Sequence, residues 1–377
     1  MSRAGGSAAC GRLELPHGAG SFRPLPARRK GAPFRAGNSC CADHPAPPVS
    51  HTFLSGIQPS GQAHLGNYFG AIRQHVEFAN SRPGEHLYFI ADYHSLTSVH
   101  DADQLREWVV DLAVTYLALG LDPEKALLFR QSDVPEVTEI AWLLATVTGM
   151  GLLERAHSYK DKIANGVKPS AGLFTYPLLM AADILAYDSD FVPVGKDQIQ
   201  HLEMTQDMAT HFNSRFGEVF KRPEGLMPEG EGMQRVVGLD GQKMSKSYNN
   251  GIWIFETGKP LKKRINQVVT DSRAPEEPKD PDELTLIDLL ALFLDDTELE
   301  EWKQRLRQGG AGAPGYGHLK ARLVEAIEER FREPRQRREE LLADRGELER
   351  VLAASGERAR AKAVAVRDRA ISACGLR

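Results

Sequence analysis

Short apolar runs that alternate with helical patterns constrain the fold of this chain more than any other feature. The apolar runs lie at residues 52–55, 87–91, 126–129 and 191–194. Segments with helical periodicity lie at residues 64–80, 103–119, 137–147, 176–187 and 198–216. Strands that are apolar along their whole length belong to parallel sheets covered by helices on both faces. This part of the chain therefore predicts an α/β fold, in which ligands bind at the carboxyl ends of the strands.

The pattern changes after residue 256, where the strand signal almost disappears. Helical patterns then dominate, at residues 283–294, 319–332 and 348–373. A further helix is predicted to open at Thr297, with Glu300 completing a capping box. We therefore expect an all-helical domain at residues 257–377, after an α/β domain at residues 49–256.

The first 50 residues differ in composition from both domains. They hold seven Arg and Lys residues against only Glu14 and Asp43, and they are rich in Gly, Ala, Ser and Pro. Because they show no apolar periodicity, residues 1–48 are predicted to be a disordered basic extension. An acid-poor, Arg-rich stretch also fits an organellar transit peptide, so a transit peptide and an extension without function both stay open.

Composition narrows the class of protein. No apolar run reaches the ~20 residues of a membrane span, and residues 42–373 contain no cysteine. Disulfide and cysteine-metal frameworks are thereby excluded from the body of the chain, and no protein-held metal is predicted. A net charge of −4 gives no overall basic field for DNA. We expect a cytoplasmic protein without membrane or DNA partners, or an organellar matrix protein if residues 1–48 are a transit peptide.

The loop between the first predicted strand and helix has the composition of an anion site. Residues 59–67 read PSGQAHLGN. Helix N-termini present unpaired N–H groups to anions. His64 adds a donor that can be cationic, and Gly66 lets a nucleotide approach the backbone closely. The signature of a Walker P-loop is missing from this stretch, so a P-loop protein is not predicted.

A second motif, KMSKS at residues 243–247, carries two lysines on a loop that contains glycine. Lys243 and Lys246 are flexible point charges suited to a migrating pyrophosphate. A bare lysine pair is more often a solvated surface, but this five-residue string is far rarer. Taken together, the two motifs predict a protein that holds ATP by its phosphates and moves an adenylyl group.

One predicted helix carries a candidate pocket. Tyr176, Met180 and Asp183 lie at positions i, i+4 and i+7, so they share one helix face. An aspartate in an otherwise apolar helix is costly to bury without a partner. Asp183 is therefore either a capping or salt-bridged residue or an acceptor for a ligand donor.

The two motifs resemble the HIGH and KMSKS signatures of class I aminoacyl-tRNA synthetases. The first reads His64-Leu65-Gly66-Asn67, and tryptophan enzymes commonly lack the final His. Further segments resemble bacterial-type tryptophanyl-tRNA synthetases, at residues 55–61, 66–68, 176–185, 192–198 and 269–272. The resemblance extends over residues 52–377.

This resemblance implies a Rossmann-like parallel-sheet catalytic domain, a C-terminal helical anticodon-recognition domain and a homodimer. It also implies activation of L-tryptophan with ATP and Mg²⁺ to tryptophanyl-adenylate, followed by transfer to tRNA(Trp). Carried over by motif, ATP would be bound by Gln58, Pro59, Ser60, Gly66, Asn67, Gly195, Lys196, Asp197, Val236, Lys243, Met244, Ser245, Lys246 and Ser247. The groups expected to stabilise transition-state charge are His64, Lys243 and Lys246. Lys196 stands where the family usually has an acidic residue.

The resemblance also implies a tryptophan site. Asp183 would accept the indole N–H, Met180 would pack on the ring, and His94 would lie beside the pocket. Tyr176 and Gln198 would hold the amino-acid head group. No separate editing domain is visible, and a site built around one hydrogen bond can reject an analogue that lacks the donor by roughly 10⁴–10⁵-fold.

Several alternatives stay open. A tyrosyl-tRNA synthetase shares the fold and the signatures, although that family tends to have Gln where Met180 stands. A nucleotidyltransferase without a tRNA substrate is disfavoured by the helical domain, and a non-catalytic relative that binds tRNA or tryptophan is disfavoured by the intact phosphate motifs.

His201 and His211 are ten residues apart, which is not metal-ligand spacing, so both are expected to be core or surface residues. Trp142 is expected to lie in the core.

Overall fold

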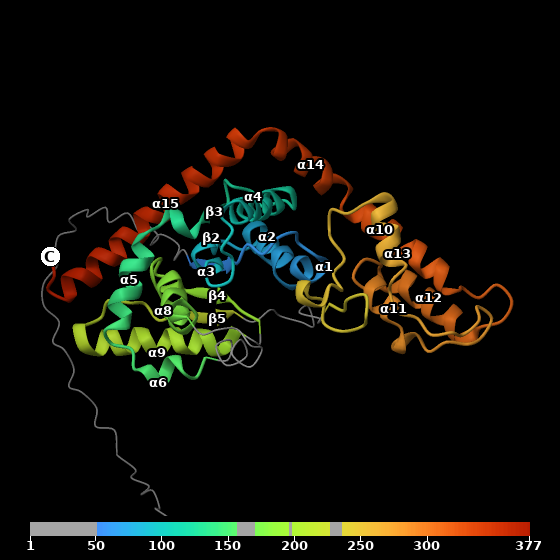
Figure 1. Cartoon of the computed structure of the whole chain (residues 1–377), viewed down its shortest axis with the longest axis horizontal. Coiled ribbons are helices and arrows are strands. Elements are labelled where there is room, and N and C mark those ends of the chain that lie inside the picture. Colours follow the sequence, from blue (N-terminus) through green and yellow to red (C-terminus); the bar gives the residue numbers. More distant parts are fainter. Residues whose placement is uncertain (1–50, 157–169, 196–197, 227–235) are drawn as a thin grey trace, which may run out of the picture. The chain divides into compact units, whose positions relative to one another are not determined.

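The computed structural model describes residues 51–156, 170–195, 198–226 and 236–377 (Figure 1). The predicted extension at residues 1–48 lies outside these residues, as do Lys196 and Asp197.

A five-stranded parallel sheet forms the centre of the fold. Its strands are β1 (Thr52–Ile57), β2 (Glu85–Ile90), β3 (Ala126–Arg130), β4 (Phe191–Pro193) and β5 (Glu224–Leu226). They lie side by side in the order β3-β2-β1-β4-β5. The chain builds outward from β1 to β3 and then crosses to the other side of β1, so the order reverses between β1 and β4. Ligands bind at such a switch point, beyond the carboxyl ends of the two strands.

The four predicted strands are confirmed, and β5 is an addition. β5 has three residues, one of them Gly225, and two of its positions are exposed. It therefore lacks the apolar run by which the other strands are recognised. Neighbouring residues of the inner strands face opposite sides, as a pleated strand requires. Leu87 and Phe89 pack into one hydrophobic core, whereas Tyr88 and Ile90 pack into the other.

Helices cover both faces of the sheet (Figure 1). Among the described residues before residue 220, the helices are α1 (Leu65–Asn67), a π-helical turn (Tyr68–Ile72), α2 (Arg73–Ser81), α3 (Asp92–Ser95), α4 (Ala102–Ala118), α5 (Glu136–Ala145), α6 (Met150–Leu153), α8 (Ala171–Leu185) and α9 (Ile199–Phe216). Helix α8 begins five residues earlier than predicted, because the Ser170 hydroxyl accepts a hydrogen bond from the Leu173 N–H at 3.1 Å and caps its first turn.

Trp142 lies on the outer side of α5. The inner side of that helix is occupied by Val137, Ile140 and Leu144, which are all buried. The Trp142 side chain is 71% exposed, so its predicted place in the core is wrong.

Helices dominate after residue 257, as predicted. They are α10 (Gly258–Ile265), α11 (Thr285–Leu290), α12 (Asp296–Gln308), α13 (Tyr316–Arg330), α14 (Arg332–Ala343) and α15 (Arg345–Ala373). Helix α12 is capped by Asp295, which accepts from the Glu298 N–H at 2.9 Å. The predicted capping box at Thr297 is therefore wrong, because Thr297 already lies inside the first turn.

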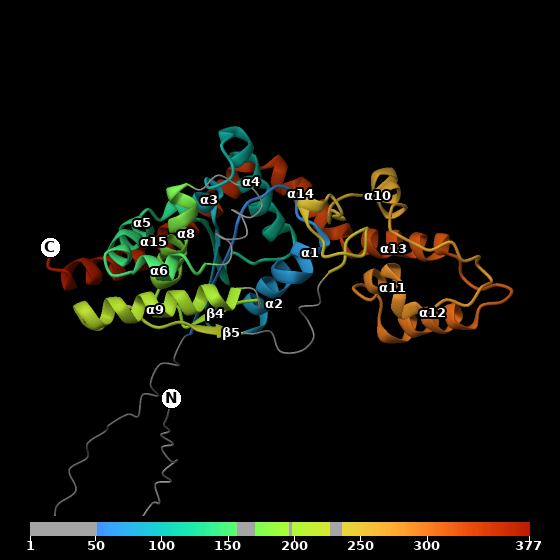
Figure 2. The ribbon, with the colours of Figure 1, turned by 60° about the horizontal axis from the view of Figure 1, so that its bottom comes forward.

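Helix α13 contacts both α10 and α11, and α11 contacts α12, in the group of helices seen in Figure 2, whereas α14 and α15 return to the α/β part of the fold. Helix α14 packs on α4, and α15 packs on β3 and α5. Gly356 permits this close approach, because a Cβ there would meet the Asp133 Cβ at 3.0 Å. The domain boundary at residue 257 stays a prediction.

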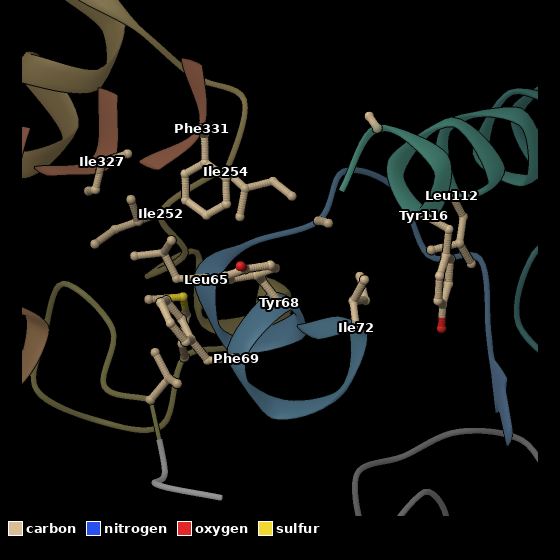
Figure 3. Packing of buried hydrophobic residues seen from close by; sticks show 14 of the residues in the cluster. Leu65, Tyr68, Phe69, Ile72, Leu112, Tyr116, Ile252, Ile254, Ile327 and Phe331 are labelled. Atoms are coloured by element: carbon tan, nitrogen blue, oxygen red, sulfur yellow. The ribbon is translucent and has the colours of Figure 1, made fainter. Parts of the chain in front are cut away.

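The helical segment that starts at His64 is anchored by aromatic packing (Figure 3). Tyr68 and Phe69 follow the first motif, and both are buried. Phe331, between α13 and α14, meets the Tyr68 ring edge-on with centroids 5.0 Å apart. Ile252 and Ile254, just after the second motif, belong to the same core. Residues from three distant parts of the sequence thereby hold the two motifs in place.

Candidate active site

The first motif begins at the carboxyl end of β1, at the predicted binding edge. His64 caps α1 reciprocally with Asn67: the His64 Nδ1 accepts from the Asn67 N–H, and the Asn67 Oδ1 accepts from the His64 N–H, both at 3.2 Å. An imidazole whose Nδ1 accepts carries its proton on Nε2. The departure of residue 67 from the HIGH signature therefore has a structural use, since the Asn67 side chain completes the cap by accepting from the His64 N–H. The ring tautomer is set by the backbone N–H of residue 67.

His64 supplies a neutral donor. Its side chain is buried, and burial together with the nearby Lys246 charge lowers the pKa of His64 to about 4. Of the two charge states that the sequence left open, the neutral ring is therefore the one present near neutral pH. What the ring offers a ligand is its Nε2–H.

The second motif sits on a tight loop that Asn250 holds together. The Asn250 Oδ1 accepts from the Ser245 N–H at 2.8 Å, and its Nδ2 donates to the Asp240 Oδ1 at 2.7 Å and to the Lys243 carbonyl at 3.1 Å. Gly238 leaves room for this side chain, because a Cβ there would fall 2.4 Å from the Asn250 Cγ. Asn250 was not among the predicted site residues, since a loop asparagine gives no signal of which backbone groups it bridges.

The structure brings the two motifs into contact. The Lys246 Nζ donates to the Ser60 carbonyl and hydroxyl, both at 3.0 Å, and to the Gly61 carbonyl at 2.9 Å. The Gly66 N–H points at the Met244 sulfur at 3.4 Å. Backbone hydrogen bonds from Leu65 to Ile252 and from Ile254 to Ala63 fix the same approach, at 2.9 and 3.2 Å. The two motifs, nearly 180 residues apart in sequence, therefore lie against each other in the fold.

Lys246 is the more enclosed of the two lysines, and Lys243 is exposed. Burial lowers the pKa of Lys246 to about 8, with the Asp111 carboxylate opposing that shift. Its ammonium group thus has three oxygen acceptors and an incomplete hydration shell. Such a cation is well placed for an anionic ligand that replaces the carbonyl contacts.

Asp183 forms the centre of the predicted amino-acid pocket. Its side chain is buried, and the Oδ2 atom accepts from the His94 Nε2 at 2.9 Å. The Gln131 Nε2 lies 2.8 Å from both carboxylate oxygens. Burial raises the pKa of Asp183, and the hydrogen bonds from His94 and Gln131 oppose this rise. His94 thus reaches the predicted pocket, whereas Gln131 was not predicted, although it directly follows β3 at the binding edge.

The two residues predicted to hold the amino-acid head group meet at one histidine. The Tyr176 hydroxyl lies 2.8 Å from the His201 Nε2, and the Gln198 Oε1 lies 3.0 Å from the His201 Nδ1. His201 is buried, which is the first of the two positions, core or surface, that were expected for it. It also links α8 to α9, which spacing alone did not indicate. Met180 is partly buried against the same core.

The phosphate motifs and the Asp183 pocket are connected through α3. Ser95 directly follows His94, and its hydroxyl donates to the Pro59 carbonyl at 3.2 Å. Among the other predicted nucleotide residues, Pro59 and Val236 are buried, whereas Gln58 and Ser247 are exposed. Gly195 lies just beyond β4, across the switch point from the first motif. The site therefore has a cationic end and a buried carboxylate end, joined by a short helix.

A family model of class I tRNA synthetases (W and Y), the tryptophan and tyrosine enzymes, matches residues 49–332. The chain belongs to this family. The geometry of this synthetase agrees with that placement, since both signature motifs meet at the switch point of its parallel sheet.

Similar proteins favour the tryptophan branch. A tryptophan–tRNA ligase from Rhodopirellula baltica is 51% identical over 324 residues, which cover 86% of this chain and 99% of that protein. A tryptophan–tRNA ligase from Fusobacterium nucleatum is also 51% identical, over 86% of this chain and 97% of its own length. The tryptophanyl-tRNA synthetase of Campylobacter jejuni, solved with ADP and tryptophan, has a TM-score of 0.80 at 45% identity, covering 86% of this chain and 100% of that one. The resemblance to bacterial tryptophanyl-tRNA synthetases is therefore confirmed.

Proposed function

We propose that this synthetase activates L-tryptophan with ATP to form tryptophanyl-adenylate and pyrophosphate, and then transfers the tryptophanyl group to the terminal adenosine of tRNA(Trp). The contact of Lys246 with Ser60 and Gly61 carries this proposal, because it joins both signature motifs into one cationic end. The buried Asp183 at the other end supplies the acceptor that an indole N–H requires.

Adenylate formation needs positioning and charge stabilisation rather than a covalent nucleophile on the protein. The tryptophan carboxylate attacks the α-phosphorus, and the bond to the departing pyrophosphate breaks. Lys243 and Lys246 stabilise the negative charge that develops on the pyrophosphate. His64 contributes to the same stabilisation with a hydrogen bond from its neutral Nε2–H to the phosphates. Mg²⁺ carried by the nucleotide would neutralise phosphate charge there, in keeping with its preference for phosphate and water ligands.

The nucleotide would lie along the edge formed by the ends of β1 and β4. The proposed contacts are Gln58, Pro59, Ser60, Gly66, Asn67, Gly195, Val236 and the 243–247 loop. Phosphate oxygens would replace the Ser60 and Gly61 carbonyls as hydrogen-bond acceptors of the Lys246 ammonium group. Lys196 and Asp197 stay predictions from the sequence resemblance, because they lie outside the described residues.

Tryptophan would bind between α8 and α3. Asp183 accepts the indole N–H, Met180 contacts the ring, and Tyr176 with Gln198 holds the amino-acid head group. His94, bonded to the Asp183 carboxylate, closes the pocket. Phenylalanine offers no ring donor and would leave the buried carboxylate short of a partner, which is the costly case for a buried polar group.

Amino-acid-dependent ATP–pyrophosphate exchange, measured with all twenty amino acids, tests this proposal. We expect exchange with tryptophan and background with the rest, followed by charging of tRNA(Trp). Exchange with tyrosine would identify a tyrosyl enzyme. Background with every amino acid, in a protein that still binds tRNA or tryptophan, would identify a non-catalytic relative.

We further propose a homodimer. The exposed Trp142 of α5 and Met150 of α6 support this, since their side chains are 71% and 62% exposed, and aromatic residues and methionine are enriched at interfaces. Analytical ultracentrifugation should give twice the chain mass, and Trp142→Lys should shift the equilibrium toward monomer.

For the remaining features, we propose that residues 257–377 recognise the anticodon. We also place the enzyme where it meets tRNA, in the cytoplasm, or in an organellar matrix if residues 1–48 are cleaved on import. No helix of the described residues is long and apolar enough to cross a membrane. N-terminal sequencing of the mature protein distinguishes the two locations.

A further inference from the structure

Gln131 occupies a position that the signature motifs do not account for. It directly follows β3 and starts a 3-10 turn, Gln131–Asp133. Its side chain is 1% exposed, so both ends of its amide need partners. One end faces the backbone of α3 and the other faces Asp183 on α8. Three elements that are distant in sequence thus meet at this amide.

The orientation of the Gln131 amide follows from its partners. The Tyr93 N–H lies 3.0 Å from the Oε1 atom, and a backbone N–H only donates. The Oε1 atom must therefore face Tyr93, and the NH₂ group must face Asp183. The Nε2 atom is 2.8 Å from both carboxylate oxygens, so it bridges them symmetrically.

This bridge matters because the carboxylate torsion of an aspartate is soft. The last torsion of Asp is a broad, two-fold rotor, and packing alone defines it poorly. A single hydrogen bond from His94 to Oδ2 would let the carboxylate rotate about that contact. The second donor, which spans both oxygens, fixes the plane of the group.

The partners also divide the two carboxylate oxygens into different roles. The Oδ2 atom accepts from both His94 and Gln131, whereas among the described residues the Oδ1 atom accepts from Gln131 alone. An ionised carboxylate oxygen can accept more than one hydrogen bond. The Oδ1 atom therefore keeps capacity for a donor from a ligand.

We propose that Gln131 is a positioning residue for the side chain of the amino acid, whose amide fixes the Asp183 carboxylate so that Oδ1 receives the indole N–H. This inference rests on the proposed activation of tryptophan and deepens it. Gln131 acts through Asp183 and does not touch the ring. Its effect is selectivity for a substrate that carries the N–H donor.

The test compares tryptophan with 3-(benzothiophen-3-yl)alanine, in which sulfur replaces the indole N–H in a ring of similar shape. The variant Gln131→Met keeps the length of the side chain and removes the amide. We expect kcat/KM for tryptophan in pyrophosphate exchange to fall roughly 10- to 100-fold in Gln131→Met, the range for an unmade buried hydrogen bond. The value for the analogue should stay within about threefold, because the analogue never used that bond.

Ser132→Ala is the matched control. It is the adjacent residue, but its hydroxyl donates to Asp92 rather than to Asp183, so the ratio of the two substrates should not change. An equal loss for both substrates in Gln131→Met would indicate a purely structural role and overturn the inference. If that variant does not fold, Gln131→Asn replaces it: the shorter amide should lose the same selectivity, and a wild-type ratio would overturn the inference.

The wild-type protein separates this inference from the proposed function. No tryptophan-dependent exchange in the wild type would contradict the function itself. Exchange that proceeds equally well with tryptophan and with the analogue would leave the activity intact and overturn the inference, because Oδ1 would then receive no N–H.

Discussion

The two ends of the site are built in opposite ways. The phosphate end consists of loop segments whose cations, Lys243 and Lys246, sit in one short motif and are exposed or half-buried. The carboxylate end consists of single residues from three elements, His94, Gln131 and Asp183, around a buried charge. A ligand with several mobile negative charges can be held by flexible cations, whereas one N–H donor must be met by a fixed acceptor. The two ends should therefore respond differently to substitution.

The largest effect is expected from Lys246→Ala. This lysine is the cation held against both Ser60 and Gly61, so its loss removes charge where pyrophosphate develops it. Loss of one preorganised donor costs roughly 100- to 1,000-fold in rate. The rate of adenylate formation in a single turnover measures this loss. The affinity for tryptophan should stay unchanged. An unchanged rate would contradict the proposed role of Lys246. Lys262→Ala, which removes an exposed lysine of α10, is the control for loss of surface charge.

The pH dependence of kcat/KM for ATP provides a second test of the phosphate end. A lysine is charged below its pKa, so with the pKa of Lys246 lowered to about 8, its cation is present at pH 7 and is lost as the pH rises further. The cationic fraction, and with it kcat/KM, should fall about tenfold per pH unit well above that value. Lys246→Arg should move this loss to higher pH. Because the pKa of His64 is about 4, no inflection from His64 is expected near pH 6.5.

Asn250→Ala sharpens the comparison, because it changes the support of the phosphate end and leaves its charges in place. It removes the partner of the Ser245 N–H, the Lys243 carbonyl and Asp240. We expect a loss of about 1–3 kcal/mol in the free energy of unfolding and a raised KM for ATP. Denaturant unfolding measures the free energy, and pyrophosphate-exchange kinetics measure the KM for ATP. Gln242→Ala, on the exposed part of the same loop, should be neutral, and a neutral Asn250→Ala would show that the loop holds its shape by other contacts.

The contrast also explains what the sequence could and could not predict. Lys246 and His64 each stand in a contiguous sequence motif, so their place in a phosphate-binding site could be predicted without the fold. The shared face of Tyr176 and Asp183 followed from helical period alone. Gln131 was not predictable, because its contact with Asp183 depends on how β3 and α8 are placed in space. The charge state of His64 was left open for a similar reason: burial, which no local pattern encodes, decides it.

The smallest effect should arise where the two ends meet. Ser95 is buried next to His94, and its hydroxyl donates to the Pro59 carbonyl of the phosphate loop. Ser95→Ala removes one hydroxyl donor, which lies 3.2 Å from the Pro59 carbonyl and 3.4 Å from the Ala91 carbonyl. A neutral hydrogen bond is worth about 1 kcal/mol, and every proposed ligand stays in place. If α3 connects the ends, the KM for ATP and the KM for tryptophan should both rise, by about two- to fivefold each. Lys246→Ala, by contrast, acts on the ATP end, and Gln131→Met acts on the tryptophan end. Ser98→Ala is the control, because the Ser98 hydroxyl donates to the Ser95 carbonyl at 3.4 Å on the same segment without reaching Pro59. A rise in one KM alone would mean that the ends work independently, since a shared support must shift both substrates together.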